Sequence, residues 1–148
     1  MPFFCQSQLA SPRDYIVVLF QPGPDEATQK AISALKKTKY DGHAGEEETS
    51  MMYVIRPDLV HAEEAKKQTG EDQAHLKYLP FGYTGIWWYA RFPNHYDGDG
   101  SQYSKELGEM LLNSDAGQLV ELIRFLKKDN TIETLTKEFY SKSGAPVK

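Results

Sequence analysis

Apolar residues recur three or four positions apart in four stretches of the chain, residues 25–37, 46–56, 101–129 and 132–140. This spacing places the apolar side chains of each stretch on one helical face, so it predicts four amphipathic helices with a buried face. The predicted inward positions are Ala27, Ile32 and Leu35 in the first stretch, Tyr103, Leu107, Met110, Leu111, Leu119, Leu122, Ile123 and Leu126 in the third, and Leu135 and Phe139 in the fourth. Much of the chain is therefore expected to be helical.

Two apolar segments near the start predict different structures. Residues 2–9 are apolar enough to favour burial and suit a short helix. Residues 15–20 form an apolar run rich in β-branched side chains and without alternation, which is typical of a parallel strand buried on both faces. Because the chain offers few other segments of this kind, we expect an α/β fold with few strands and many helices.

Residues 79–100 combine many aromatic side chains with glycine and proline, which predicts an irregular arm with short extended pieces. Burial of these aromatics in a core and packing against a neighbouring subunit agree equally well with the composition. His95 lies in this arm, between Asn94 and Tyr96. A histidine held by structural hydrogen bonds and a catalytic histidine are the two alternatives for that position.

The stretch of residues 40–52 holds the candidate chemistry. His43 lies between Gly42 and Gly45, and glycine allows the backbone conformations of a tight loop and the close approach of other groups. The three glutamates that follow predict the first turn of a helix, where the helix dipole favours negative charge. The loop would bring the ring of His43 and the carboxylate of Glu48 together, an arrangement that suits proton transfer or metal chemistry.

An ordinary structural interpretation applies to the same residues, since glycine-rich loops and glutamates at helix starts are common. We expect at most one of the three glutamates to point inward and the others to face solvent. Glu48 is favoured as the inward one, because Met51, Met52 and Ile55 follow it three, four and seven positions later on the same helical face.

The size and charge of the chain exclude several classes of function. Its 148 residues fit a single domain, predicted here over residues 1–148. The formal net charge of −4 offers no basic surface for nucleic acid or for a membrane. The single cysteine, Cys5, excludes an internal disulfide and agrees with a reducing compartment, so we expect a cytoplasmic protein.

The sequence from Asp41 to Met52 resembles the creatininase (creatinine amidohydrolase) family, in which a Gly-His-x-Gly loop precedes a Glu-Thr-Ser helix start. The run Arg56-Pro57-Asp58-Leu59-Val60 matches the Pro-Asp-Leu-Val segment that follows in that family. Residues 88–96 and 105–108 resemble one branch of the same family. The similarity extends over nearly the whole chain.

The resemblance implies a three-layer α/β/α domain and a metal-dependent amidohydrolase that cleaves a cyclic amide or a formamide-type C–N bond. It implies a divalent metal, zinc or manganese with iron as a third candidate, and a small-molecule amide substrate. It assigns proton transfer to His43. To Glu48 it assigns a role as metal ligand or as a group next to a metal ligand. Asp41 is a further candidate beside them, and a homo-oligomer agrees with the family's habit of forming rings.

The departures from the family pattern change what we expect of this chain. Family members carry a Glu-x-His pair, an aspartate and a Gly-His-Gly-Gly-Asn-type turn towards their amino ends, and this sequence contains none of them. The chain thus resembles the carboxyl-terminal portion of the domain, for which we expect weak metal binding and little or no turnover alone. Lys39 and Gly42 stand where creatinine-cleaving members have tryptophan and glutamate, which argues against creatinine as substrate. The alternative is a non-catalytic remnant or an interaction subunit.

Overall fold

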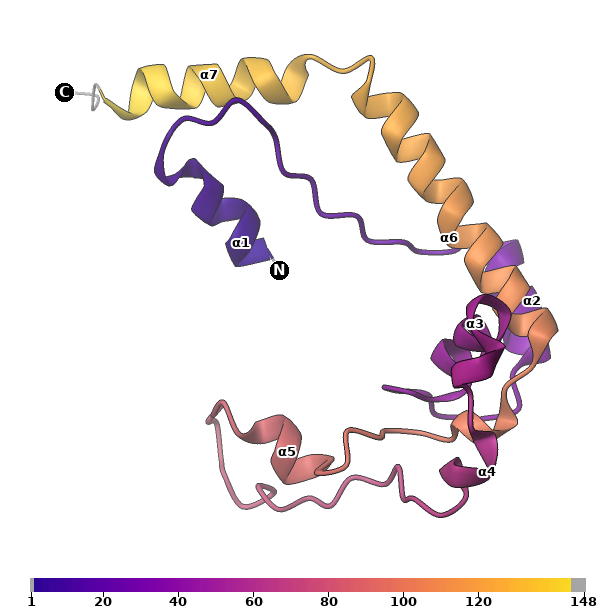
Figure 1. Ribbon diagram of the computed structural model, residues 1–148. Helices are drawn as coiled ribbons and strands as arrows, with labels where there is room; N and C mark the ends of the chain where they lie inside the picture. The colour runs from indigo at the N-terminus through magenta and orange to yellow at the C-terminus, as the bar shows by residue number, and fades with distance from the viewer. Residues whose placement is uncertain (1, 145–148) are drawn as a thin grey trace. The chain divides into compact units, whose positions relative to one another are not determined.

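The computed structural model describes residues 2–144 and forms no β-strand within them. In chain order its helices are α1 (Pro2–Ser7), η1 (Gln8–Ala10), α2 (Glu26–Leu35), α3 (Glu46–Ile55), η2 (Pro57–Leu59), α4 (Ala62–Ala65), α5 (Trp87–Arg91), η3 (Gly100–Gln102), α6 (Lys105–Leu126) and α7 (Thr131–Ser143), where η marks a 3-10 helix (Figure 1). The four helices predicted from apolar spacing correspond to α2, α3, α6 and α7. None of the described helices is both long and apolar enough to cross a lipid bilayer.

The chain divides into two units. One comprises Met1–Gly23 and Ala116–Lys148, and the other comprises Pro24–Asp115, so that α6 begins in the second unit and ends in the first. His43 and Glu48 both belong to the second unit. The prediction of one domain over residues 1–148 includes residue 1 and residues 145–148, which lie outside the described residues, and it stays a prediction.

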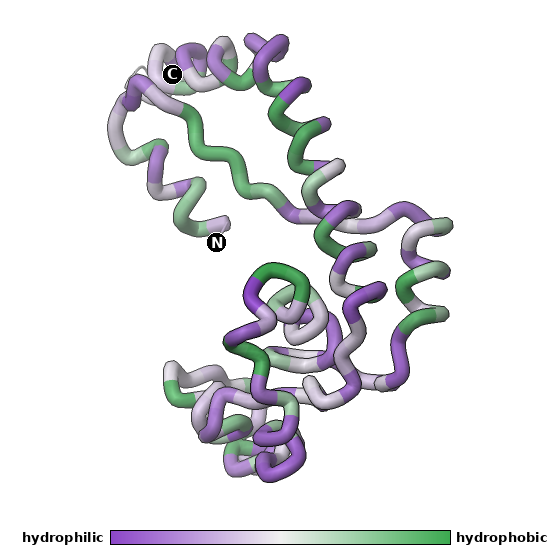
Figure 2. The backbone as a smooth tube through the Cα atoms, turned by 45° about the vertical axis from the view of Figure 1, so that its right-hand side comes forward, coloured by the Kyte–Doolittle hydropathy of each residue, from purple (hydrophilic) through white to green (hydrophobic). Residues whose placement is uncertain are grey.

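The predicted strand at residues 15–20 is wrong for the described structure. The segment is extended but unpaired, and Tyr15, Ile16 and Val18 are all exposed. Figure 2 shows it as a hydrophobic run of extended chain. A strand exists only through hydrogen bonds to a neighbouring strand, and residues 2–144 supply none. The three-layer arrangement implied by the resemblance is therefore not formed by these residues.

Several apolar residues of the first unit are exposed although their spacing predicts burial. Phe3 and Phe4 in α1, Leu119 and Ile123 in the second half of α6, and Leu135 and Phe139 in α7 all face solvent. Spacing shows which face of a helix is apolar, but burial also needs an element packed against that face. Contacts between the two chain segments of the unit include the Tyr140 hydroxyl, which donates to the carbonyl of Ser11 at 2.8 Å.

The core of the second unit is formed by Ile32, Leu107 and Leu111, from α2 and α6. Leu35, Met51 and Met110 pack against it from α2, α3 and α6, whereas Ala27, predicted inward, is exposed. Helix α3 and helix α6 therefore meet directly beside the segment that carries His43 and Glu48.

Ser50 and Gly108 lie where the backbones of α3 and α6 approach each other closely. The buried Ser50 hydroxyl donates to the carbonyl of Glu46 at 2.6 Å and accepts from the backbone N–H of Ser104 at 3.0 Å. A Cβ at Gly108 would lie 2.1 Å from the carbonyl oxygen of Ser50, which is far inside van der Waals contact. Only glycine lets the two backbones approach this closely.

Replacing Gly108 by alanine is therefore expected to lower the free energy of unfolding by about 1–3 kcal/mol, since α3 and α6 must move apart. Gly117→Ala on the same helix is the matched control, because a Cβ there meets nothing within 4 Å. Both changes gain helix propensity, so Gly117→Ala should be neutral or stabilising. Urea unfolding followed by circular dichroism measures both, and equal effects would contradict the contact described here.

Candidate functional site

His43 is delivered by a tight loop directly before α3. Gly45 N–H donates to the carbonyl of Gly42 at 3.2 Å, and Ala44 adopts a left-handed conformation with φ of 58°. The Thr49 hydroxyl donates to the carbonyl of Ala44 at 3.0 Å and ties the loop to the helix. The loop followed by a helix start agrees with the prediction for this stretch.

The ring of His43 faces the carboxylate of Glu48. Nδ1 of His43 lies 3.1 Å from Oε2 of Glu48, and the backbone N–H of Ala44 donates to the same oxygen at 2.8 Å. Both side chains are about half exposed, at 56% and 50%. Because Nδ1 of His43 contacts Glu48, the Nε2 atom is the ring nitrogen that remains available to a substrate. The roles assigned to the two residues stay predictions.

Glu46, and not Glu48, is the inward-pointing glutamate of the three. Its side chain is fully buried and accepts from the backbone N–H groups of Lys37 and Thr38, at 2.9 and 2.7 Å, and from the Thr38 hydroxyl at 2.7 Å. Met52 and Ile55, predicted to share an inward face with Glu48, are exposed. The expectation was wrong because the polar turn after α2 supplies donors that only Glu46 reaches.

These hydrogen bonds also set the charge state of Glu46. Burial by itself raises the pKa of a carboxyl group, but the donors of Thr38 and Lys37 stabilise the carboxylate and hold the pKa of Glu46 below its usual value. Glu46 is thus a buried anion that joins α3 to the end of α2. Its role is structural, and it fixes the position from which Glu48 projects two residues later.

Asp41 also stabilises the start of α3. Its Oδ2 accepts from the backbone N–H of Glu47 at 2.8 Å and lies 3.3 Å from Nζ of Lys36. Burial lowers the pKa of Lys36, but the contacts with Glu47 and Asp41 outweigh it and raise that pKa above its usual value. Asp41 therefore acts on the helix end that carries Glu48, and these contacts do not bring it to the ring of His43.

A second segment, residues 92–98, holds the loop from the other side. The backbone N–H of Asp97 donates to the carbonyl of His43 at 2.9 Å. The Tyr40 hydroxyl donates to Oδ2 of the buried Asp97 at 2.8 Å, and this bond is the main reason that the pKa of Tyr40 lies above its usual value. A Cβ at Gly42 would lie 2.5 Å from that carboxylate, so glycine is needed there.

The structure brings two residues of the aromatic arm to this site. The ring of Trp88 meets the ring of His43 edge-on, with centroids 5.9 Å apart and planes at 73°. Its Nε1–H donates to Nδ1 of His95 at 3.0 Å. Sequence reasoning kept His95 as a candidate but did not connect Trp88 with His43, because no local pattern joins positions that are 45 residues apart in the chain.

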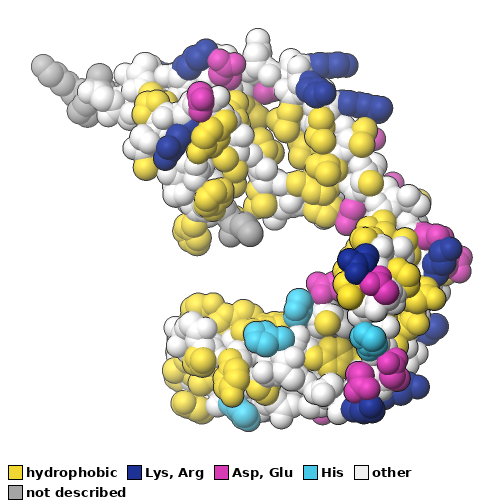
Figure 3. Space-filling model, viewed as in Figure 1, with side chains coloured by type: hydrophobic (Ala, Val, Ile, Leu, Met, Phe, Trp, Pro, Cys, Tyr) yellow, Lys and Arg dark blue, Asp and Glu magenta, His cyan; other side chains and the backbone are white. Residues whose placement is uncertain are grey.

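The arm itself differs from the prediction of short extended pieces, because residues 87–91 form helix α5. Ala90 within this helix and Phe92 directly after it are buried, whereas Phe81 and Tyr83 in the arm are exposed, as is Tyr78 just before it. Some aromatic side chains of the arm are therefore packed near α5, and others are exposed to solvent. All four histidines of the sequence lie in the second unit and are exposed, and Figure 3 shows histidine side chains on this surface.

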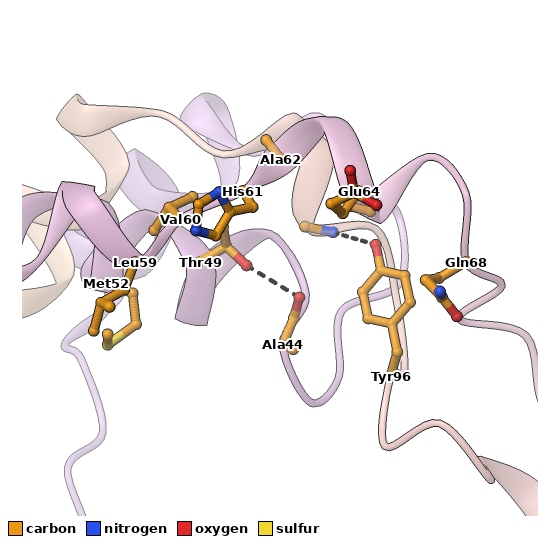
Figure 4. A pocket seen from close by; sticks show the side chains of 12 residues that line it. Ala44, Thr49, Met52, Leu59, Val60, His61, Ala62, Glu64, Gln68 and Tyr96 are labelled. Atoms are coloured by element: carbon orange, nitrogen blue, oxygen red, sulfur yellow. Dashed lines mark hydrogen bonds between the residues drawn. The ribbon is translucent and has the colours of Figure 1, made fainter.

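A cavity of about 300 Å³ opens next to the loop (Figure 4). It lies between α3, η2 and α4, and most of its lining is apolar; the lining residues are Ala44, Thr49, Met52, Leu59, Val60, His61, Ala62, Glu64, Ala65, Gln68, Tyr96 and Gly100. The Tyr96 hydroxyl accepts from the backbone N–H of Gly100 at 2.8 Å and closes one wall. His43 and Glu48 do not line this cavity, but Ala44 and Thr49 are their direct neighbours in the chain.

The described residues do not fit a complete divalent metal centre. No group of three or more His, Cys, Asp or Glu side chains within residues 2–144 is arranged to hold a metal ion. His43 and Glu48 contribute one nitrogen and one carboxylate, and structural and catalytic zinc sites use three or four protein ligands. Any complete centre would need ligands in addition to these residues.

Comparison with protein families agrees with the loop and helix start described above. The family model for creatinine amidohydrolase, creatininase, matches residues 6–123, which is well over half of the chain. The match defines a hydrolase class with an α/β fold, of the amidohydrolase type. The chain belongs to the creatininase family. Comparisons with curated proteins and with solved structures gave no match.

Proposed function

We propose that this chain carries the proton-transfer part of a creatininase-type, metal-dependent amidohydrolase that cleaves a non-peptide C–N bond of a cyclic amide or a formamide. The observation that carries the proposal is the 3.1 Å contact between Nδ1 of His43 and Oε2 of Glu48, with Glu48 itself held by the N–H of Ala44. Membership of the creatininase family supports the reaction class.

The geometry supports a defined role for each residue. Glu48 accepts from Nδ1–H and so keeps the neutral ring of His43 in the tautomer whose Nε2 is a base. Nε2 takes a proton from the attacking water and returns it to the leaving nitrogen, and Glu48 stabilises the imidazolium formed in between. In this family a divalent metal supplies polarisation of the carbonyl and activation of water. The proton transfer assigned to His43 requires no metal ligand from this chain.

The surroundings of the pair favour a small substrate with an apolar part. The cavity beside Ala44 and Thr49 is mostly apolar and, at about 300 Å³, lies at the lower end of the volumes of small-molecule pockets. An amide bound at His43 could extend its substituent towards this cavity. N-substituted formamides and lactams are therefore the first substrates to test.

The test incubates the purified chain with N-cyclohexylformamide, with a lactam and with creatinine, each with added Zn²⁺ or Mn²⁺ and with chelator. Amine, amino acid or creatine release is followed by chromatography. Because the described residues supply too few ligands for a complete metal centre, we expect only slow hydrolysis of the formamide or the lactam, weakly stimulated by added metal, and none of creatinine. Absence of hydrolysis with every substrate and metal would contradict the enzymatic proposal.

The second candidate function is a non-catalytic interaction subunit, and the exposed part of the aromatic arm favours it. No charged residue lies between Lys77 and Arg91. Phe81 and Tyr83 in the arm, and Tyr78 directly before it, are largely exposed. Contiguous exposed apolar surface marks interaction sites in many proteins. Self-association at micromolar concentration that Phe81→Ser weakens, together with no hydrolysis, would support this candidate over the first.

A further inference from the structure

We propose that His95 is a positioning residue that acts through the indole of Trp88 on the ring of His43. The inference rests on the proposed function of His43 and adds a residue to that site. The coupling between His95, Trp88 and His43 can be tested even if the chain hydrolyses no substrate. Three contacts support it: from His95 to Trp88, from Trp88 to His43, and from the backbone N–H of Asp97 to the carbonyl of His43.

The first contact fixes the indole of Trp88. Its Nε1–H donates to Nδ1 of His95 at 3.0 Å, so the neutral ring of His95 carries its proton on Nε2. His95 adopts a left-handed conformation with φ of 57°, and its N–H donates to the carbonyl of Phe92 at 3.0 Å. An uncommon conformation of a non-glycine residue is maintained by its surroundings, and here it points the acceptor at Trp88.

The second contact places Trp88 against His43. The two rings meet edge-on, with their centroids 5.9 Å apart. On its other side Trp88 packs on Phe92, whose side chain is 2% exposed, with centroids 4.9 Å apart. Phe92 thus supplies a buried support for the indole, and His95 sets the rotation of the indole on that support.

The third contact ties both rings to one turn of the chain. The N–H of Asp97, two residues after His95, donates to the carbonyl of His43 at 2.9 Å. The backbone of His43 and the indole that contacts its ring are therefore both held by residues 92–97. The indole limits rotation of the half-exposed imidazole and so favours the rotamer in which Nδ1 reaches Glu48.

The experiment compares His95→Asn with His95→Leu in the full chain. Asn places an oxygen acceptor the same number of bonds from Cα as Nδ1 of histidine, and it tolerates the left-handed conformation. Leu has a similar branching pattern but no acceptor. Trp88→Phe removes the donor and keeps a ring. Trp87→Phe changes the neighbouring tryptophan, whose ring packs edge-on against Trp88 with centroids 5.5 Å apart but does not hydrogen-bond His95.

Two proton NMR signals report the proposed coupling: that of the indole N–H of Trp88 and that of Hε1 of His43. The sequence contains two tryptophans and four histidines, so the variants above together with His43→Gln assign them. We expect His95→Leu to shift both signals, Trp88→Phe to shift the signal of His43, and His95→Asn to leave the signal of His43 nearly unchanged. Trp87→Phe serves only to tell the two indole signals apart, because its ring packs on Trp88. With an active enzyme, His95→Leu should lower kcat roughly 10-fold at constant KM, and His95→Asn should restore it.

A signal of His43 that stays in place in His95→Leu would overturn the proposal, and so would equal shifts in His95→Asn and His95→Leu. Because His95→Leu also changes the strain of the left-handed residue, Trp88→Phe gives an independent decision: no shift of His43 in that variant overturns the proposal as well. Coupled shifts in a chain that hydrolyses nothing would support the positioning role and reject the proposed function, so the two failures are distinguishable.

Discussion

Replacing His43 by glutamine is expected to lower kcat for formamide or lactam hydrolysis by about 10²–10⁴-fold, the usual contribution of a general acid–base residue. Glutamine can still hydrogen-bond to Glu48, but it cannot carry a proton from water to the leaving nitrogen. KM should change little, because His43 acts on the transferred proton and supplies little binding area. Initial rates over a range of substrate concentrations separate the two constants.

His75→Gln is the matched control, since His75 is an exposed histidine of the same unit that contacts neither His43 nor Glu48 through any hydrogen bond described here. It should retain full activity.

Glu48→Gln should lower kcat by roughly 10-fold, a smaller loss than that caused by removing the base itself. The amide of glutamine still orients Nδ1 of His43 but no longer stabilises the imidazolium. A His43→Gln variant as active as the wild type would remove His43 from the mechanism.

Replacing Glu46 by alanine is expected to lower the free energy of unfolding by about 3–5 kcal/mol, a large part of the stability of a domain of this size. The change removes the buried acceptor of three donors, the N–H groups of Lys37 and Thr38 and the hydroxyl of Thr38, in a partly buried network. Glu47→Ala, one residue along, is the control, because that side chain is about one-third exposed and bonds mainly to Lys36. Its loss should cost less than about 1 kcal/mol.

The same carboxylate gives the stability a pH dependence. The pKa of Glu46 is lower in the folded chain than in the unfolded chain, so its stabilising effect is complete above the ordinary glutamate pKa and is lost as the pH falls through the lower, folded value. Unfolding free energies measured between pH 7 and pH 3 should therefore fall more steeply for the wild type than for Glu46→Gln. Parallel curves for the two proteins would mean that Glu46 titrates normally.

Helices α2 and α3 and the loop before α3 could be predicted from local sequence because their signals are local. Apolar residues at helical spacing place α2 and α3, and Pro57 ends α3 at Ile55 because the residue before a proline avoids the helical conformation. The loop before α3 follows from Gly42 and Gly45, whose small size permits the close contacts found there. His43 and Glu48 were found by the same means, since five residues of loop and first helical turn bring them within reach of each other.

Features that depend on distant parts of the chain were not predictable in this way. The strand at residues 15–20 has the right residues, but pairing depends on a partner segment, and the described residues supply none. Helix α5 lies where glycine and proline favoured irregular chain, because the burial of Ala90 and Phe92 outweighs local preference.

Local sequence patterns were sufficient to locate helices α2, α3 and α6, to place a histidine loop before α3, and to show the resemblance to the creatininase family. Only the tertiary structure decided that Glu46 is buried while Glu48 faces His43, and that Trp88 and His95 stand beside the same loop. The physical reason is that helix periodicity acts over a few residues, whereas the direction of a carboxylate depends on donors that another element brings to it. For Glu46 those donors come from the turn after α2, and for the ring of His43 the neighbouring indole comes from α5.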